Sequence, residues 1–356
     1  MSLVNNTHFS AASFQQYDLN KELFGFVAVR GTFIPVPEKR LVPAEIMTRF
    51  LWEDEYEGDP DTTSLLRQGD FVPWKLGTDV TFLGSSYAPG GLPQRSWKCG
   101  IKVANRLEKV LVVHGPRWWT PYWTPRWSTG KHRLFKGWEL SEAEPVTSVE
   151  LSWKAAFGGP RPCKPDETAP ADINPDNPLG CGWLDFEHSP RDQPIAAPRI
   201  EADVDPILDW RRIDYMPQGF APIPPWWRPR QRYMGTIDDA WERERHPFLP
   251  LDFNQMFWQC AHPDCIIKPW VNGNEAVQFL NLHPDHGLLR VFLPRIALRG
   301  TLKRSGEDDL LFQLHLDGIH ADFRARREKR IHLTWRGWFP WSDDEGDIEL
   351  NYVNGE

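Results

Sequence analysis

The high content of proline and glycine constrains the fold of this chain more than any other feature of its sequence. The 356 residues include 33 prolines and 26 glycines. Proline lacks the backbone N–H that helices and central strands use, and glycine favours turns. The sequence therefore predicts short elements joined by irregular segments, and it argues against a fold built from long helices.

Alternation of apolar and polar residues in the N-terminal third predicts strands. An apolar run covers residues 24–33, and alternating segments cover 79–83 and 97–103. Because turn residues at 87–91 separate the two alternating segments, we expect these segments to form a hairpin. The apolar run at 108–114 predicts a neighbouring strand that is buried on both faces.

The C-terminal quarter alternates more regularly than the rest of the chain. The pattern covers residues 310–317, breaks at Gly318, resumes over 319–324 and continues over 331–336. Successive alternating runs of this kind predict an antiparallel meander.

The middle of the chain, about residues 118–265, shows little periodicity and is rich in proline, tryptophan, asparagine and aspartate. One helix is predicted over 236–246, with Thr236 as its N-cap and Pro247 as its stop, and we expect it to pack through Trp241. The density of aromatic residues favours ordered loops over disorder, and long ordered loops are often functional.

These patterns predict a mainly β protein. Its core is expected to be an antiparallel β-sandwich or barrel-like sheet, with a long irregular Pro/Trp-rich insertion and few short helices. We expect residues 1–356 to form one composite domain, in which the C-terminal meander at about 295–340 completes the core.

Charge and hydropathy argue against two classes of partner. The formal net charge of -8 does not suit a nucleic-acid or anionic-membrane surface, which is basic. Residues 1–20 lack the pattern of a signal peptide, and no apolar run approaches the roughly 18 residues of a membrane helix. Five scattered cysteines do not indicate a disulfide framework. We therefore expect a cytoplasmic protein with no nucleic-acid and no membrane partner.

Common catalytic motifs are missing from the sequence, among them the phosphate-binding loop, the dinucleotide fingerprint, the HExxH zinc helix and the nucleophile elbow. The best metal candidates are Cys260, His262 and Cys265. Structural zinc sites usually need four ligands in paired short spacings. A second pair would have to come from Cys163 and Cys181 or from His283 and His286, and the spacing supports neither choice. We predict no cofactor and no metal, although the sequence leaves metal binding by these three residues open.

The acidic stretch at 54–61 is compatible with two roles. Its carboxylates could serve a glycosidase or another hydrolase, which uses a pair of acidic residues. They could equally form a solvated loop closed by Gly58 and Pro60, and we favour this interpretation. Spacing in the sequence does not fix the distance between two carboxylates in space.

Proline-flanked tryptophan clusters are the strongest signal for a protein-binding surface. The chain has 19 tryptophans, and most are expected in the core. Prolines beside the clusters exclude regular helix, and adjacent residues of an extended segment point to opposite sides. At least one tryptophan of each adjacent pair is therefore a candidate for exposure. The clusters contain Trp127 and five candidate protein-binding residues: Trp118, Trp119, Trp123, Trp226 and Trp227.

A series of short blocks rich in glycine, proline, aspartate and aromatic residues occurs between about residues 23 and 294. The blocks are 55–60, 64–65, Asp70, 73–75, 78–80, 87–91, 156–159, 177–182, 219–224, 227–230, 235–241, 250–253 and 257–259. In this order they resemble a bacterial family long catalogued as a domain of unknown function and found beside type VI secretion genes.

The resemblance implies an adaptor, or chaperone, that helps to load a toxic effector onto the secretion spike. It implies no catalytic residues. We therefore expect a non-catalytic protein whose partner is an effector toxin, a spike protein of the valine–glycine repeat or PAAR type, or both. Two alternatives are a hydrolase that uses the acidic stretch and a structural component of the secretion particle.

Overall fold

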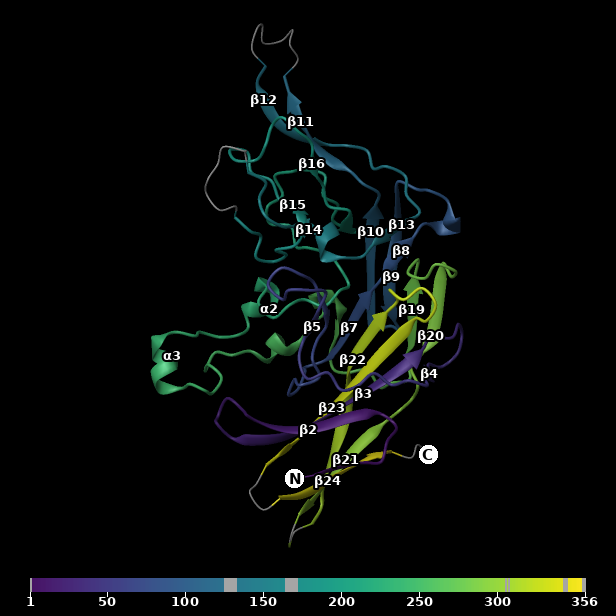
Figure 1. Cartoon of the computed structure of the whole chain (residues 1–356), viewed down its shortest axis with the longest axis vertical. Coiled ribbons are helices and arrows are strands. Elements are labelled where there is room, and N and C mark those ends of the chain that lie inside the picture. The colour runs from purple at the N-terminus through teal and green to yellow at the C-terminus, as the bar shows by residue number, and fades with distance from the viewer. Residues whose placement is uncertain are drawn as a thin grey trace.

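The protein is mainly β, as the sequence predicts, and its largest sheet has ten strands (Figure 1). The structure is a computed structural model, and it describes residues 2–124, 133–163, 172–304, 306, 308–341 and 345–353. The strands of the large sheet are β1 (Leu3–Asn5), β2 (Ser10–Tyr17), β3 (Leu23–Ile34), β4 (Val42–Pro43), β7 (Thr78–Leu83), β18 (Ile266–Ile267), β21 (Leu298–Arg304), β22 (Leu310–Asp322), β23 (Arg330–Pro340) and β24 (Glu345–Tyr352).

The large sheet is nearly closed into a barrel. Its main path has the order β1-β24-β21-β22-β23-β3-β2, with β7 also paired to β22. Because β1 and β2 follow each other in the chain but lie at opposite ends of this order, the N-terminal segment brings the two ends of the sheet together. Most pairs are antiparallel, while β1–β24 and β7–β22 are parallel.

Smaller sheets complete the fold. A five-stranded sheet has the order β17 (Ile200–Ala202), β10 (Leu107–His114), β9 (Ser96–Val103), β19 (Ala276–Leu280) and β20 (Leu288–Phe292). A three-stranded sheet has the order β12 (Phe135–Leu140), β11 (Trp118–Trp123) and β16 (Ile195–Ala196). Three two-stranded pairs are β5 (Glu55–Tyr56) with β6 (Leu65–Arg67), β8 (Ser85–Tyr87) with β13 (Ser148–Glu150), and β14 (Phe157–Gly158) with β15 (Cys181–Gly182).

The helices of the described residues are all short, as expected for a chain rich in proline. They are α2 (Arg228–Gln231), α3 (Asp239–Glu244) and the 3₁₀ turns η1 (Pro89–Gly91), η2 (Trp153–Ala155), η3 (Gln255–Trp258) and η4 (Pro263–Cys265). None of them is long and apolar enough to cross a membrane.

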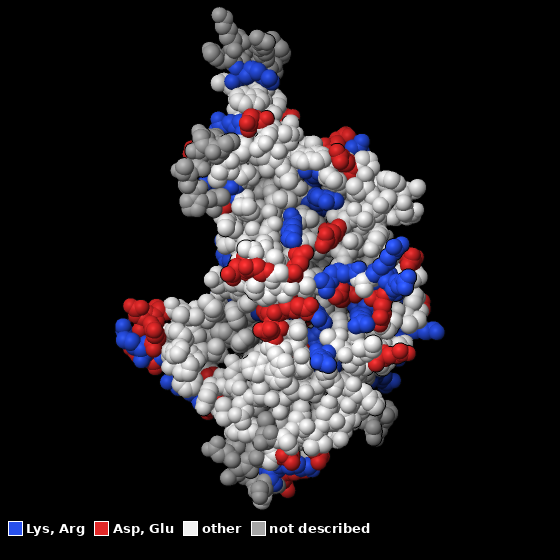
Figure 2. All heavy atoms as spheres, viewed as in Figure 1, with Lys and Arg blue, Asp and Glu red and all other residues white. Residues whose placement is uncertain are grey.

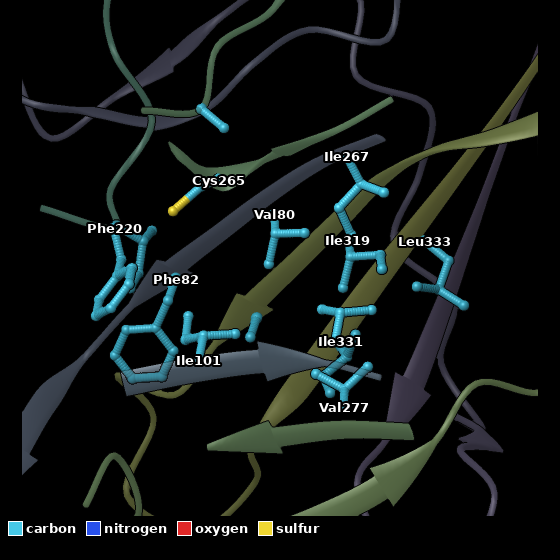
Figure 3. Close-up of a cluster of buried hydrophobic side chains, with 14 of the residues drawn as sticks. Val80, Phe82, Ile101, Phe220, Cys265, Ile267, Val277, Ile319, Ile331 and Leu333 are labelled. Atoms are coloured by element: carbon cyan, nitrogen blue, oxygen red, sulfur yellow. The ribbon is translucent and has the colours of Figure 1, made fainter. Parts of the chain in front are cut away.

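The main core lies between the ten-stranded and five-stranded sheets. Val80, Ile319 and Ile331 of the large sheet lie beside Ile101 and Val277 of the smaller one, and all five are essentially buried (Figure 3). Burying an aliphatic side chain of this size stabilises a fold by about 1.5–3 kcal/mol. The packing of these two sheets is therefore a major source of stability.

Two predictions for the N-terminal third are wrong. Residues 79–83 and 97–103 are both strands, but β7 belongs to the large sheet and β9 to the five-stranded sheet, so they do not form a hairpin. The intervening β8 pairs instead with β13. The strand at 108–114 does pair with β9, but its residues alternate between buried and partly exposed positions, and it is not buried on both faces.

The break at Gly318 is a bulge within one strand. Residues 310–322 form the single strand β22, and its register with β23 shifts between Leu316 and Gly318. The extra residue, Asp317, moves the buried positions from even to odd numbers, which explains the change of phase in the sequence pattern.

The irregular middle of the chain has more structure than its sequence indicates. It contains the three-stranded sheet, which has a separate hydrophobic cluster around Trp119 and Trp138. The predicted helix is shorter than expected, because its N-cap is Asp238, whose carboxylate accepts the Trp241 N–H at 2.9 Å. We call residues 236–253, which include α3, the arm. Within the arm, Thr236 bonds to Asp252 and the Trp241 indole N–H donates to the Phe248 carbonyl.

Candidate protein-binding site

Aromatic side chains form a row across the outer face of the large sheet. Phe14 of β2 is paired in register with Phe26 of β3, which is paired with Trp338 of β23. Because neighbouring residues of a strand point to opposite faces, Val27 and Phe339 enter the core while Phe26 and Trp338 point outward. The strand register therefore places three rings side by side on one surface.

Trp74 covers this row from the segment that precedes β7. Its ring stacks on Phe26, with centroids 5.6 Å apart and an angle of 22°, and lies 6.3 Å from Trp338. The segment is held by Lys75, whose Nζ donates to Asp79 at 2.6 Å and whose carbonyl accepts the Trp270 indole N–H at 3.1 Å.

Beside this row lies an open groove of about 350 Å³, which we call the aromatic groove. A volume of this size and a mainly apolar lining are typical of ligand-binding sites. Phe24, Trp74 and Trp338 line one part of it, while Leu249, Phe253 and Trp258 come from the arm that carries α3 and from η3. The remaining lining comes from Gln16, Tyr17, Asp18, Leu19, Asn20, Pro73 and Gln255.

Contacts between the arm and the β2–β3 turn fix the width of the aromatic groove. The Tyr17 ring meets Phe248 edge-on at 5.1 Å, and Lys21 lies over the same ring at 4.9 Å. The Arg245 guanidinium donates to the carbonyls of Leu19 and Leu249. These contacts join an element of the N-terminal region to the arm, 226 residues away along the chain.

Exposed aromatic residues extend the apolar surface beyond the groove. Phe71 is 49% exposed, and its ring centroid lies 4.3 Å from that of Phe14. Trp52 is 63% exposed, and its ring centroid lies 6.4 Å from that of Phe71. Figure 2 shows a broad uncharged area over the region where β2 lies in Figure 1, bordered above by charged side chains. Aromatic residues at the surface of a folded protein are typical of protein interfaces.

The other end of the same sheet face carries buried charges, which we call the ion-pair cluster. Arg30 donates two hydrogen bonds to Asp70, at 2.6 and 2.7 Å. Arg336 donates to Asp317 at 2.6 Å, and Lys75 to Asp79 at 2.6 Å. All six side chains are almost completely buried.

Burial and pairing shift the pKa values of the cluster in different directions. Burial alone would raise the pKa of Asp79, but the Lys75 ammonium and several hydrogen bonds outweigh it and lower that pKa. For Asp317, burial outweighs the Arg336 guanidinium, and the pKa is raised. Burial lowers the pKa of the neighbouring His320 to about 3, so this imidazole is neutral at physiological pH.

The ion-pair cluster surrounds a cavity of only about 40 Å³. At roughly 10–15 Å³ for each water, this volume holds a few water molecules. His320 and Arg336 line this cavity. The Nε2 atom of His320 and the Nε atom of Arg336 have no hydrogen-bond partner among the described residues. Since each acid is already paired with a cation, the arrangement is that of a structural network, and the cavity is too small for a substrate.

The acidic stretch at 54–61 forms a hairpin whose carboxylates are engaged in local contacts. Glu55 is paired with Arg67 across β5 and β6, and Glu57 with Lys154 at 2.8 Å. Asp59 accepts the backbone N–H of Asp61 at 2.9 Å, as in a solvated turn. These contacts agree with the loop interpretation that the sequence favours.

The three metal candidates are close in sequence, but their polar atoms have separate partners. The Cys260 sulfur lies 4.0 Å from Lys75 Nζ, and His262 Nδ1 lies 2.7 Å from Lys109 Nζ. Burial raises the thiol pKa to about 12 for Cys260 and about 11 for Cys265, which disfavours the thiolate that binds metal. Among the residues that the structure describes, no three His, Cys, Asp or Glu side chains form a group that could hold a metal ion.

The five tryptophans singled out from the sequence do not come together in one site. Trp119 and Trp227 are each 1% exposed and belong to two different hydrophobic clusters, so they offer no surface to a partner. Trp118, Trp123 and Trp226 are partly buried. None of the five lines the aromatic groove. Trp127 lies outside the described residues.

The tryptophans that line the groove were not among the residues predicted from the sequence, although the sequence contains signals for them. Trp74 and Trp258 each lie in a block that carries the family resemblance. Trp338 lies three residues after Trp335, so in a continuous strand it must point to the opposite face. Their meeting in space could not be read from the sequence, because they come from three distant segments.

The fold and this surface define a mainly β protein with an open groove lined by aromatic and aliphatic side chains. A family model described as "Uncharacterized protein conserved in bacteria (DUF2169)" matches residues 21–336, and the chain belongs to this family. No curated protein and no solved structure gives a significant match to the chain.

Proposed function

We propose that this protein is a non-catalytic adaptor, or chaperone, of type VI secretion. In this proposal it binds an effector toxin in the bacterial cytoplasm and helps to load it onto a spike protein of the valine–glycine repeat or PAAR type. The aromatic groove is the observation that carries the proposal, because Trp74, Trp258 and Trp338 offer a preformed apolar surface. The ordered sequence blocks that resemble a secretion-associated family supply the choice of partner.

The mechanism proposed is binding by apolar complementarity. A partner would insert aromatic or aliphatic side chains into the aromatic groove, where the indole rings provide large contact areas at little cost in side-chain entropy. The groove is held open by the arm contacts at Tyr17 and Arg245, so little reorganisation would accompany binding.

Co-purification with the products of neighbouring genes tests this proposal. The tagged full-length protein would be expressed together with the effector and spike genes beside it, and the bound proteins would be identified by mass spectrometry. We expect an effector or a spike protein to be retained by the native chain and to be lost from the Trp258→Ala and Trp338→Ala variants.

The tryptophans selected from the sequence provide matched controls. Trp118→Ala and Trp226→Ala also remove a partly buried indole, but at positions away from the groove. These variants should retain the partner. If no neighbouring gene product binds the folded native protein, the adaptor proposal is wrong. If the controls lose the partner and the groove variants keep it, the groove is not the binding site.

A further inference from the structure

The near-closure of the large sheet is incomplete at β2, which pairs with β3 on one side and with no described strand on the other. The strand β2 pairs with β3 over eight residues without a bulge, from Ser10 opposite Arg30 to Tyr17 opposite Leu23. Just beyond it, the Asp18 N–H donates to the Glu22 carbonyl at 2.9 Å. Because hydrogen-bonded pairs alternate along an antiparallel ladder, even-numbered residues of β2 bond to β3.

The backbone groups of the odd-numbered residues of β2 therefore point away from the sheet. Ser13, Gln15 and Tyr17 each present an N–H and a carbonyl on this side. In the part of the chain that the structure describes, no hydrogen bond reaches these groups. The side chains of Gln15 and Tyr17 are also exposed.

The sequence of β2 gives this edge no protection. Proteins usually block a long edge strand with a charged residue, a proline, a bulge or a covering segment. The eight residues of β2 include no charged residue and no proline.

Other sheet edges among the described strands are blocked or short. The edge strand β20 is covered by the segment at 38–41, in which the N–H groups of Glu38 and Leu41 donate to β20 carbonyls at 2.8 Å. The edge strands β1 and β17 have three residues each, and β12 carries Lys136 and Glu139. The open edge of β2 therefore contrasts with the treatment of edges elsewhere in the same molecule.

An apolar surface lies directly beside the open edge. A strand added to β2 would run about 4.8 Å from it and would place every second side chain on the face that carries Phe14. On that face, Phe71 and Trp52 are largely exposed, and the aromatic groove begins at Gln16. A strand is the form of ligand that satisfies both the backbone groups of β2 and the exposed rings.

We infer that the protein partner binds through an extended segment that pairs with β2 as an additional strand. The segment would have about six residues, with aromatic or aliphatic side chains at alternate positions that contact Phe71, Trp52 and the aromatic groove. This inference rests on the proposed function, since it specifies how the partner of that function is recognised.

Peptide selection on the full-length protein tests the inference. Random peptides displayed on phage would be selected against the immobilised protein, and the selected sequences would be synthesised for affinity measurements. We expect alternating apolar residues. Methylation of the peptide backbone nitrogen at alternate residues should weaken binding at least tenfold, and methylation at the residues between them should have little effect, because only every second N–H faces β2.

Variants of β2 distinguish backbone pairing from side-chain contact. Gln15→Pro removes one outward N–H without removing a hydrogen bond to β3, so it should lower the affinity for the peptide at least tenfold. Gln15→Ala, the matched control, retains the backbone N–H and should bind as the native protein does. Amide hydrogen exchange should show slower exchange at residues 13, 15 and 17 when the peptide is bound.

Three results of the peptide experiments would overturn the inference. They are the failure to select any peptide, binding that is insensitive to the position of backbone methylation, and equal binding by Gln15→Pro and native protein. A concentration-dependent dimer with protected β2 amides would also overturn it, in favour of pairing between two copies. The Gln15→Pro variant separates this inference from the adaptor proposal. If it still co-purifies with a product of the neighbouring genes, the partner does not bind by strand addition, but the adaptor proposal stands.

Discussion

The outer face of the large sheet is built in two different ways at its two ends. Along β3, Arg30 of the ion-pair cluster and Phe26 of the aromatic row lie four residues apart on the same face. Along β23, Arg336 and Trp338 are separated by a single residue. The same two strands thus support a closed polar region and a partly open aromatic one.

The difference shows which region is available to a ligand. In the ion-pair cluster, each of Asp70, Asp79 and Asp317 is paired with a cation of the same chain. In the aromatic region, Trp52, Phe71 and Tyr17 remain exposed although they could bury their rings in a complex. Charges that are satisfied internally stabilise or specify the fold, whereas apolar rings left in water are free to drive association.

The largest expected effect is the loss of a buried ion-pair partner. Arg336→Ala leaves Asp317 buried without its cation, which should cost about 3–5 kcal/mol of unfolding free energy in urea denaturation. The control Arg228→Ala breaks an exposed pair with Asp176 and should cost about 1 kcal/mol or less. If the two variants lose similar unfolding free energy, the buried ion pairs of the cluster contribute no more to stability than an exposed pair does.

Two tryptophans of β23 allow the core and the groove to be compared on one strand. Trp335 is 1% exposed, so Trp335→Ala should cost about 3–5 kcal/mol of stability. Trp338→Ala should cost less stability, because this ring is only partly buried. It should lower the affinity for the partner or for a selected peptide by about 2 kcal/mol, or roughly 30-fold. Denaturation and isothermal titration calorimetry measure the two effects. Unchanged binding by Trp338→Ala would contradict the role of the groove.

Acid should destabilise the polar region through His320. Its pKa is lowered to about 3 in the folded protein from an ordinary value of 6.5, so the unfolded chain binds the proton first as pH falls. The contribution of neutral His320 to the unfolding free energy is therefore fully present above pH 6.5 and decreases as the pH falls below it. At pH 5 the expected loss is about 2 kcal/mol. His262 and His332, whose pKa values are also well lowered by burial, should add to the loss.

His320→Gln should reduce the pH dependence that urea denaturation measures between pH 7.5 and 5. The expected reduction at the acid end is about 1.4 kcal/mol per pH unit, the value for one proton. An unchanged slope would mean that His320 is accessible to protons in the folded state, which would break the contrast between a closed and an open region.

The smallest effect is expected at the acidic hairpin. Glu57 and Lys154 are both about half exposed, so Glu57→Gln should change stability by less than about 1 kcal/mol and leave partner binding unchanged. A substrate-hydrolysis screen on the native protein, Glu55→Gln and Asp59→Asn addresses the hydrolase alternative. Turnover that both variants abolish without unfolding would favour an enzyme over an adaptor.

Much of the fold could be predicted because strand periodicity is a local property. Alternation identified β7, β9, β22 and β23, an apolar run identified β3, and the prolines correctly predicted short helices. Pairing could not be predicted equally well, since it depends on distant segments. The strand β7, for example, pairs with β22 and β18 of the C-terminal third, and a plausible turn after it led to the wrong partner.

The aromatic groove depends on tertiary structure more than the strands do. Adjacent tryptophans were a strong compositional signal, but Trp119 and Trp227 fill cores, because large rings near prolines also serve to pack irregular segments. The groove residues Trp74, Trp258 and Trp338 are isolated in the sequence and meet only after β3, β23 and the arm have been arranged.

The sequence by itself determined the class of fold, the family and the composition of β2, which lacks charge and proline. Only the tertiary structure decided that β2 lies at an open edge and that three distant tryptophans share one groove. The physical reason is that backbone propensity and alternation act between neighbours in the chain. Exposure, strand order and the meeting of side chains follow from which surfaces the whole fold leaves uncovered.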